Sequence, residues 1–278
     1  MSEIVTTARR YVTLSLPLCA SLEVAARWAP HDALTPWASA LRALCNEAEK
    51  VQNGHTALLG LRWVPALFAT FTAALSAISA ERFQNLRTLV VDPEIATRYG
   101  EGNISLIEVV DPWKPFREVN DIVPNVLARH VIDGDDPVAA YEALAGNKAG
   151  KRYAPASDWL HAELQRLGDD WFLDDSSYDV AFKRTELFLG LLTQDLAAQR
   201  ITDPERAWLV RSNWFGRSTW QDRYSRKSSV EQAFDEYSRE GSSWPPLAAG
   251  LFGKDSQRVE DAFAGYSEDY NRIRQHRF

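Results

Sequence analysis

A run of 18 residues without a charged side chain, 63–80, limits this chain to two kinds of structure. A stretch of that length is at the lower limit of what can cross a membrane as a helix. It is, however, rich in Ala and also contains two Thr and two Ser, so it is not a continuous series of large aliphatic side chains. We therefore expect a helix that is buried in the core of a soluble protein, with no membrane partner.

Composition supports a globular protein. The 278 residues are 45% hydrophobic and 25% charged, which are the proportions of an ordinary folded domain. A chain of this size buries enough surface to be stable without disulfides or metals. The two cysteines, Cys19 and Cys45, form no CxxC motif or Cys/His cluster, and no phosphate-binding glycine motif occurs. We expect reduced thiols, no metal site, no cofactor and a cytoplasmic location.

The pattern of apolar residues predicts a helical chain with a few strands. Alternation of apolar and polar residues in "YVTLSLPL" predicts a strand at 12–18, and short apolar runs predict two more at 89–91 and 104–110. The fold class is therefore mostly α, or α+β with a sheet of two to three strands in the first 110 residues. We expect one compact unit, 1–278, with a subdivision into 1–111 and 112–278 as the alternative. Helices are predicted near 20–29, 35–52, 56–82, 118–132, 136–145, 157–168, 228–240 and 255–274, and most clearly over "DDSSYDVAFKRTELFLGLLTQDLAAQR". Ser157 and Ser176 are the expected N-caps of their helices.

Charge is unevenly distributed along the chain. Residues 1–91 carry a net charge of +2, residues 92–205 carry −11, and residues 206–278 carry +2, which together give −7. The acidity is thus confined to the middle of the sequence. Such an asymmetry favours interaction with a basic partner, because complementary charge steers association.

The acidic segment "GDDWFLDDSSYD" concentrates five carboxylates within a short distance. In a helix, two of them, Asp175 and Asp179, would share one face, with Glu186 two turns further along. Acids gather at helix N-termini, so helix capping is one interpretation. A surface for a partner and a divalent-metal site are the other two. The carboxylates are Asp169, Asp170, Asp174, Asp175 and Asp179.

A histidine that precedes this segment is the basis for the hypothesis that the chain is an enzyme. His161 follows Asp158 by three residues, so both side chains can lie on one helix face. An imidazole held by a carboxylate can serve as a general base. No HExxH or GxSxG motif is present, so whether the chain is an enzyme stays open, and we lean towards no. The candidate catalytic residues are Asp169, Asp170, Asp174, Asp175 and His161.

The segment "RAWLVRSNWFGRSTWQDRYSRK", residues 206–227, combines six cations with five aromatic side chains. Arginines beside aromatic rings occur in single-stranded nucleic-acid sites and at the centres of protein interfaces. The third interpretation is that the rings belong to the core and the arginines pair with the protein's own acids. These interpretations make opposite predictions for Trp214 and Trp220, which are buried only if the segment is packed internally.

Two functions from different classes follow. The first is an acidic, helical interaction protein that docks a basic protein partner, for example an inhibitor or a bacterial immunity-type protein. The alternative is an enzyme with a carboxylate site around 169–179, and a weaker alternative is a helical subunit of a nucleic-acid-binding assembly. A closed pocket lined by the acids would favour the enzyme, whereas an open acidic face beside apolar side chains would favour the interaction protein. The predicted partner-binding residues are Asp170, Asp174, Asp175, Asp179, Arg217, Trp220, Arg223 and Tyr224.

Overall fold

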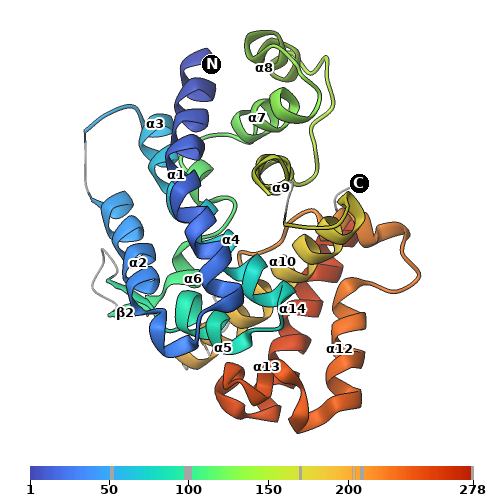
Figure 1. The fold of residues 1–278 in the computed structure, drawn as a ribbon. Coiled ribbons are helices and arrows are strands. Elements are labelled where there is room, and N and C mark those ends of the chain that lie inside the picture. The colour runs from blue at the N-terminus through green and yellow to red at the C-terminus, as the bar shows by residue number, and fades with distance from the viewer. Residues whose placement is uncertain are drawn as a thin grey trace.

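The chain folds into an assembly of helices with one small sheet (Figure 1). The computed structural model describes residues 1–50, 53–96, 102–168, 171–201, 203, 205–206 and 210–276, without the side chains of Tyr224 and His276. A two-stranded sheet and several 3-10 turns connect the helices. The elements are α1 (Ser2–Trp28), α2 (Thr35–Glu49), α3 (Thr56–Gly60), α4 (Val64–Ser79), α5 (Phe83–Leu86), β1 (Glu94–Ala96), β2 (Asn103–Ser105), α6 (Leu106–Val109), α7 (Ile122–Ile132), α8 (Pro137–Ala145), α9 (Pro155–Leu167), α10 (Asp175–Arg200), α11 (Ser218–Gln221), α12 (Ser229–Glu240), α13 (Pro245–Ala248) and α14 (Ser256–His276).

The uncharged helix α4 lies at the centre of the molecule. All but two of its residues are buried, and α1, α2, α5 and α10 pack around it. The Phe68 ring contacts Trp159 of α9 at a centroid distance of 5.3 Å, and the Phe71 ring contacts Phe182 of α10 at 4.5 Å. In the described part of the chain, only Thr56–Ser79 is long and apolar enough to span a membrane, and most of its apolar window is buried in the protein.

The strand predicted at 12–18 is wrong, because these residues belong to α1. The buried residues of α1 repeat every three or four positions, and Val12, Cys19 and Leu22 belong to this series. Leu14, which completed the apparent alternation, is 64% exposed. Pro17 lies on an exposed position of the helix and does not end it. The helical period therefore decides the structure over a segment that matched both periods.

The small sheet lies in the predicted region but has other boundaries. Residues 87–91 form a π-helical turn in place of the strand predicted at 89–91. The prediction at 104–110 is correct only for its first two residues, since β2 ends at Ser105, where the Ser105–Glu108 capping box starts α6. β1 and β2 pair antiparallel, with Ile95 opposite Ile104. The protein is thus mostly α with a small sheet, as the sequence predicted.

Helices α10 and α14 cross closely in the second half of the chain. Gly190 of α10 faces the ring of Tyr266, and a methyl group at Gly190 would overlap that ring. Tyr266 is fully buried, stacks on Phe215 at 4.7 Å, and donates its hydroxyl hydrogen to the Trp214 carbonyl oxygen at 3.0 Å. The glycine therefore allows the contact that fixes residues 214–215 between the two helices.

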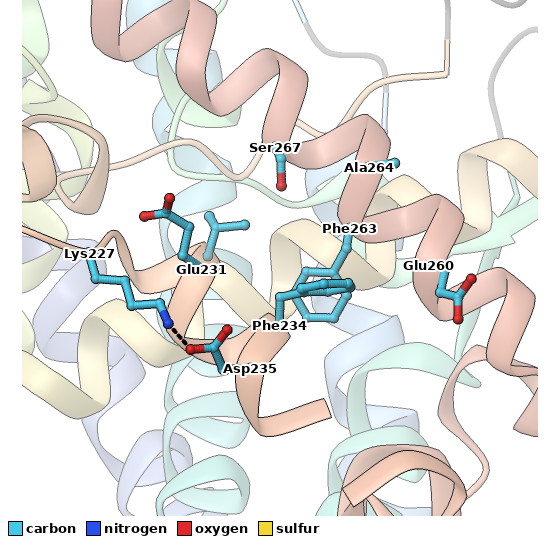
Figure 2. A pocket seen from close by; sticks show the side chains of 9 residues that line it. Lys227, Glu231, Phe234, Asp235, Glu260, Phe263, Ala264 and Ser267 are labelled. Atoms are coloured by element: carbon cyan, nitrogen blue, oxygen red, sulfur yellow. Dashed lines mark ion pairs between the residues drawn. The ribbon is translucent and has the colours of Figure 1, made fainter. Parts of the chain in front are cut away.

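A groove runs between α12 and α14 (Figure 2). Phe234 of α12 and Phe263 of α14 meet edge to face at its floor, with ring centroids 5.2 Å apart. Its volume is about 480 Å³. Phe234 is 41% exposed, whereas Phe263 is buried. Helix α12 is amphipathic. Part of its apolar face lies against α14, and the groove is formed by the part that α14 leaves uncovered.

The crossing of α10 and α14 yields a test. Replacing Gly190 with Ala should lower the free energy of unfolding by about 1–3 kcal/mol, because overpacking at Tyr266 outweighs the gain in helix propensity. Gly150→Ala is the control, because a β-carbon at Gly150 has no atom within 4 Å. Urea unfolding of both variants measures the effect, and equal stabilities would contradict the close approach.

Candidate functional site

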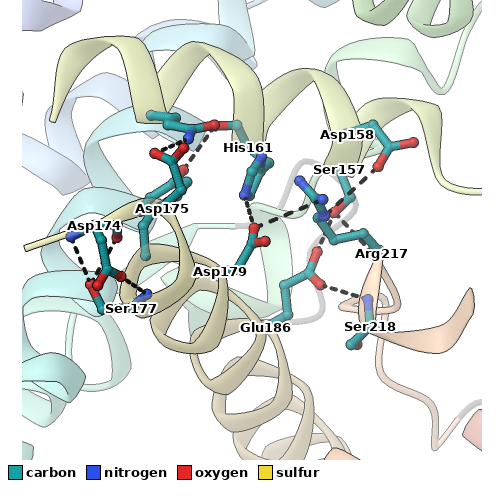
Figure 3. Close-up of polar contacts among 12 residues, drawn as sticks. Ser157, Asp158, His161, Asp174, Asp175, Ser177, Asp179, Glu186, Arg217 and Ser218 are labelled. Carbon is teal, nitrogen blue, oxygen red and sulfur yellow. Dashed lines mark hydrogen bonds and ion pairs between the residues drawn. The ribbon is translucent and has the colours of Figure 1, made fainter. Parts of the chain in front are cut away.

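The acids at the start of α10 are exposed, and Figure 3 shows the side chains that they contact. Asp174, not the predicted Ser176, is the N-cap, and its carboxylate accepts the Ser177 N–H at 2.7 Å. Hydrogen bonds from the backbone and the side chain of Ser177 lower the pKa of the Asp174 carboxyl. Asp175 is exposed and accepts a hydrogen bond from the Gln165 amide at 2.9 Å. Asp169 and Asp170 are outside the described residues.

His161 lies on the inner face of α9 and is almost fully buried. Its Nε2 is 2.6 Å from an Asp179 carboxylate oxygen, and its ring packs against Tyr178 and Phe182. Burial and the nearby Arg217 outweigh the Asp179 carboxylate and lower the pKa of His161 to about 4. The imidazole is therefore neutral near pH 7 and donates its Nε2–H to Asp179.

Arg217 is held between two carboxylates of the protein itself. Its guanidinium nitrogens are 3.9 Å from Asp158 of α9 and 3.9 Å from Asp179 of α10. The Arg217 side chain is only 14% exposed, and its Nε–H is buried without a direct hydrogen-bond partner among the described residues. Distances of this size leave room for bridging water molecules. Burial raises the pKa of Asp158, and the nearby Arg217 opposes this rise.

Glu186 completes this buried network. Its carboxylate accepts hydrogen bonds from the Ser157 hydroxyl and, at 3.4 Å, from the Ser218 N–H. The Ser157 hydroxyl oxygen in turn accepts a hydrogen bond from the backbone N–H of Arg217 at 3.1 Å. Complete burial raises the pKa of Glu186 to about 7. Gly216 lies directly against the carboxylate, where any β-carbon would overlap it.

The network joins three segments that are distant in the sequence. Asp158 and His161 share one face of α9, and Asp179 and Glu186 come from one face of α10, as their spacing predicted. The sequence did not reveal that Ser157 and residues 216–218 join them. Ser157, which had the appearance of a helix cap, lies inside the first turn of α9 with its hydroxyl directed into the core. The only available signal was Gly216, a small residue between aromatic and charged neighbours.

The cation-rich segment 206–227 is packed internally at its centre. Trp214 is 1% exposed and donates its indole N–H to the Ile107 carbonyl at 3.0 Å, whereas Trp220 is half-buried. Arg223 is half-buried as well, and its carbonyl oxygen accepts a hydrogen bond from Arg274 at 3.3 Å. Lys227 pairs with Asp235 of α12. Trp208 and the Tyr224 side chain are outside the described residues.

The arrangement determines what these groups can do chemically. A general acid or base must reach the proton that it transfers. His161, Ser157 and Glu186 are each more than nine-tenths buried, and only Asp179, with a side chain 43% exposed, faces solvent. Within the described residues, no three His, Cys, Asp or Glu side chains are grouped closely enough to hold a metal ion. The network thus has the contacts of a structural element that holds residues 216–218 on α9 and α10.

Comparison of the chain with protein-family models, with curated proteins and with solved structures finds no match.

Opposite pKa shifts in the network yield a pH test. The raised pKa of Glu186 means that the folded protein binds more protons than the unfolded chain between pH 4.5 and about 7. Its contribution to stability therefore falls by about 3 kcal/mol as the pH rises through this window. The lowered pKa of His161 acts in the opposite direction between about pH 4 and 6.5, so its contribution rises there.

Replacing Glu186 with Gln removes the first contribution and leaves the second. The stability of Glu186→Gln relative to the wild type should therefore increase by about 3 kcal/mol from pH 4.5 to 7. Urea unfolding over this pH range measures the difference, and Glu268→Gln on the exposed face of α14 is the control. If the curves of wild type and Glu186→Gln are parallel, Glu186 does not titrate in this window.

Proposed function

We propose that this chain is an interaction protein that docks a basic protein partner. The observation that supports it best is the open surface at the start of α10. Leu173 is 100% exposed there, beside the exposed carboxylates of Asp174 and Asp175. Val180, further along the same helix, is 63% exposed. We call these four residues the acidic shoulder.

The acidic shoulder has the properties that an interface for a basic partner requires. Apolar side chains exposed next to charged groups supply area that a partner can bury. The carboxylates attract basic surfaces over distances of about a Debye length and so accelerate association. The chain's net charge of −7, to which residues 92–205 contribute −11, adds to this attraction. An inhibitor of a basic enzyme is one specific form of this proposal.

The alternative of an enzyme has less support. It rests on the His161–Asp179 pair and on Glu186, whose pKa of about 7 suits proton transfer. Of these groups, only Asp179 faces solvent, whereas His161 and Glu186 are buried against α9, α10 and residues 216–218 and lie out of reach of a substrate. The hypothesis of a nucleic-acid partner also has less support, because the net charge is negative and Arg217 pairs with carboxylates of the protein itself.

The acidic shoulder can be tested without disturbing the fold. Asp174→Asn combined with Asp175→Asn removes two charges, and Asn at the N-cap preserves capping. We expect wild-type protein to retain one or more basic proteins from lysate of its source cells, and the double variant to bind the same purified partner about tenfold more weakly at low salt. Quantitative mass spectrometry identifies the partner, and calorimetry at about 50 and 200 mM salt measures its affinity.

Glu3→Gln combined with Glu118→Gln is the matched control, because it removes the same charge from exposed positions elsewhere. If the partner is acidic, or if its affinity is independent of salt and equal for both double variants, the proposal is wrong.

A further inference from the structure

The groove between α12 and α14 shares no residue with the acidic shoulder. We propose that it binds an amphipathic α-helix of the partner, apolar along one face and carrying Lys or Arg on both flanks. This inference rests on the proposed function, since it takes the partner to be a basic protein, and adds where and in what conformation the partner binds.

Helices α12 and α14 form the two walls of the groove. The lining residues of α14 are 260, 263, 264 and 267, which follow the spacing i, i+3, i+4, i+7 of one helix face over two turns. The α14 wall is therefore about 10 Å long. The other wall consists of positions 230, 231, 234 and 235 of α12 together with Lys227, which precedes that helix. A third helix of two to three turns would lie between the two walls with its own i, i+3, i+4, i+7 face towards the floor.

The floor of the groove is apolar and already ordered. Phe263 is buried, and Phe234 is fixed by edge-to-face contact with Phe263 and by the neighbouring ring of Tyr237. Val230 and Ala264 extend the floor along the two helices. Because Phe234 is held in place while 41% exposed, a partner side chain that covers it gains apolar burial at little cost in side-chain entropy.

The rim of the groove is acidic on both sides. Figure 2 shows Glu231 and Asp235 on one side of the two phenylalanines and Glu260 on the other. Lys227 pairs with Asp235, so the four charged residues have a net charge of −2. The surrounding helices share this sign, since residues 228–276 contain nine Asp or Glu and five Lys or Arg. The net charge of +2 for residues 206–278 is therefore the sum of a basic segment, 206–227, and an acidic part that follows it.

These properties together identify the occupant. Both walls are helices, so no strand edge is available for an extended peptide to join. The volume of about 480 Å³ matches that of sites that enclose several side chains. An apolar floor between acidic rims is complementary to an apolar stripe between basic flanks, and a helix with that pattern presents both at once.

The probe for this groove is a synthetic helical peptide. A peptide of about 18 residues, with Leu at the i, i+3, i+4, i+7 positions and Lys elsewhere, is long enough to fold on contact. One comparison peptide has Glu in place of Lys, and another has the same composition in scrambled order. Fluorescence anisotropy with the full-length protein should show binding of the basic amphipathic peptide at least about tenfold tighter than either comparison.

Two substitutions locate the binding site. Ala264→Arg places a long, positively charged side chain at an exposed position of the groove and should weaken binding at least about tenfold. Ala43→Arg makes the same change on the exposed face of α2 and should leave binding unchanged. Glu260→Gln keeps the shape of the rim and should weaken binding mainly at low salt. Circular dichroism verifies that each variant is folded.

The outcomes separate this inference from the proposed function. Equal binding of the basic peptide to wild type and Ala264→Arg, or no binding to wild type, would overturn the groove as the site. Equal binding of the acidic or scrambled peptide would overturn the stated occupant. In each of these cases the proposed function still stands if Asp174→Asn with Asp175→Asn weakens binding of the native partner. Loss of that effect would overturn the proposed function while leaving the peptide result unaffected.

Discussion

Burial of the uncharged helix α4 is the constraint on which the rest of the structure depends. A helix that is apolar all round must be surrounded, and α1, α2, α5 and α10 surround it. Its two aromatic side chains determine what else is brought close. Phe68 contacts Trp159 of α9, and Phe71 contacts both Phe182 of α10 and Trp214. The helices and the loop that carry the polar network are therefore positioned by one hydrophobic element.

The fold class could be predicted from the sequence because long periodic segments and the uncharged run are strong signals. The strand at 12–18 could not be excluded, since Val12 and Leu18 satisfy both a period of two and the packing of α1. Pairs within one helix, such as Asp158 with His161, follow from spacing alone. The contact between Arg217 and Ser157 does not follow from spacing, because the two residues are 60 positions apart and are brought together only by the tertiary fold.

The charges of the chain divide into two groups with different surroundings. Arg217 is largely enclosed between carboxylates. Asp174, Asp175 and Glu260 are exposed instead. Paired charges in the interior specify how segments assemble, whereas unpaired charges of one sign on the surface bias what the protein meets.

Gly216 has a consequence for how this sequence can change over evolution. Because the Glu186 carboxylate occupies the space where a β-carbon would be, residues 214–218 can dock in a single register. Insertion or deletion of one residue just before Gly216 would bring Phe215 or Arg217 to that position and separate Glu186 from its hydrogen-bond donors. Residues 225–227 are exposed and precede α12, so a change in length there leaves these contacts in place. Length variation among descendants of this chain should therefore accumulate after the network and be absent within it.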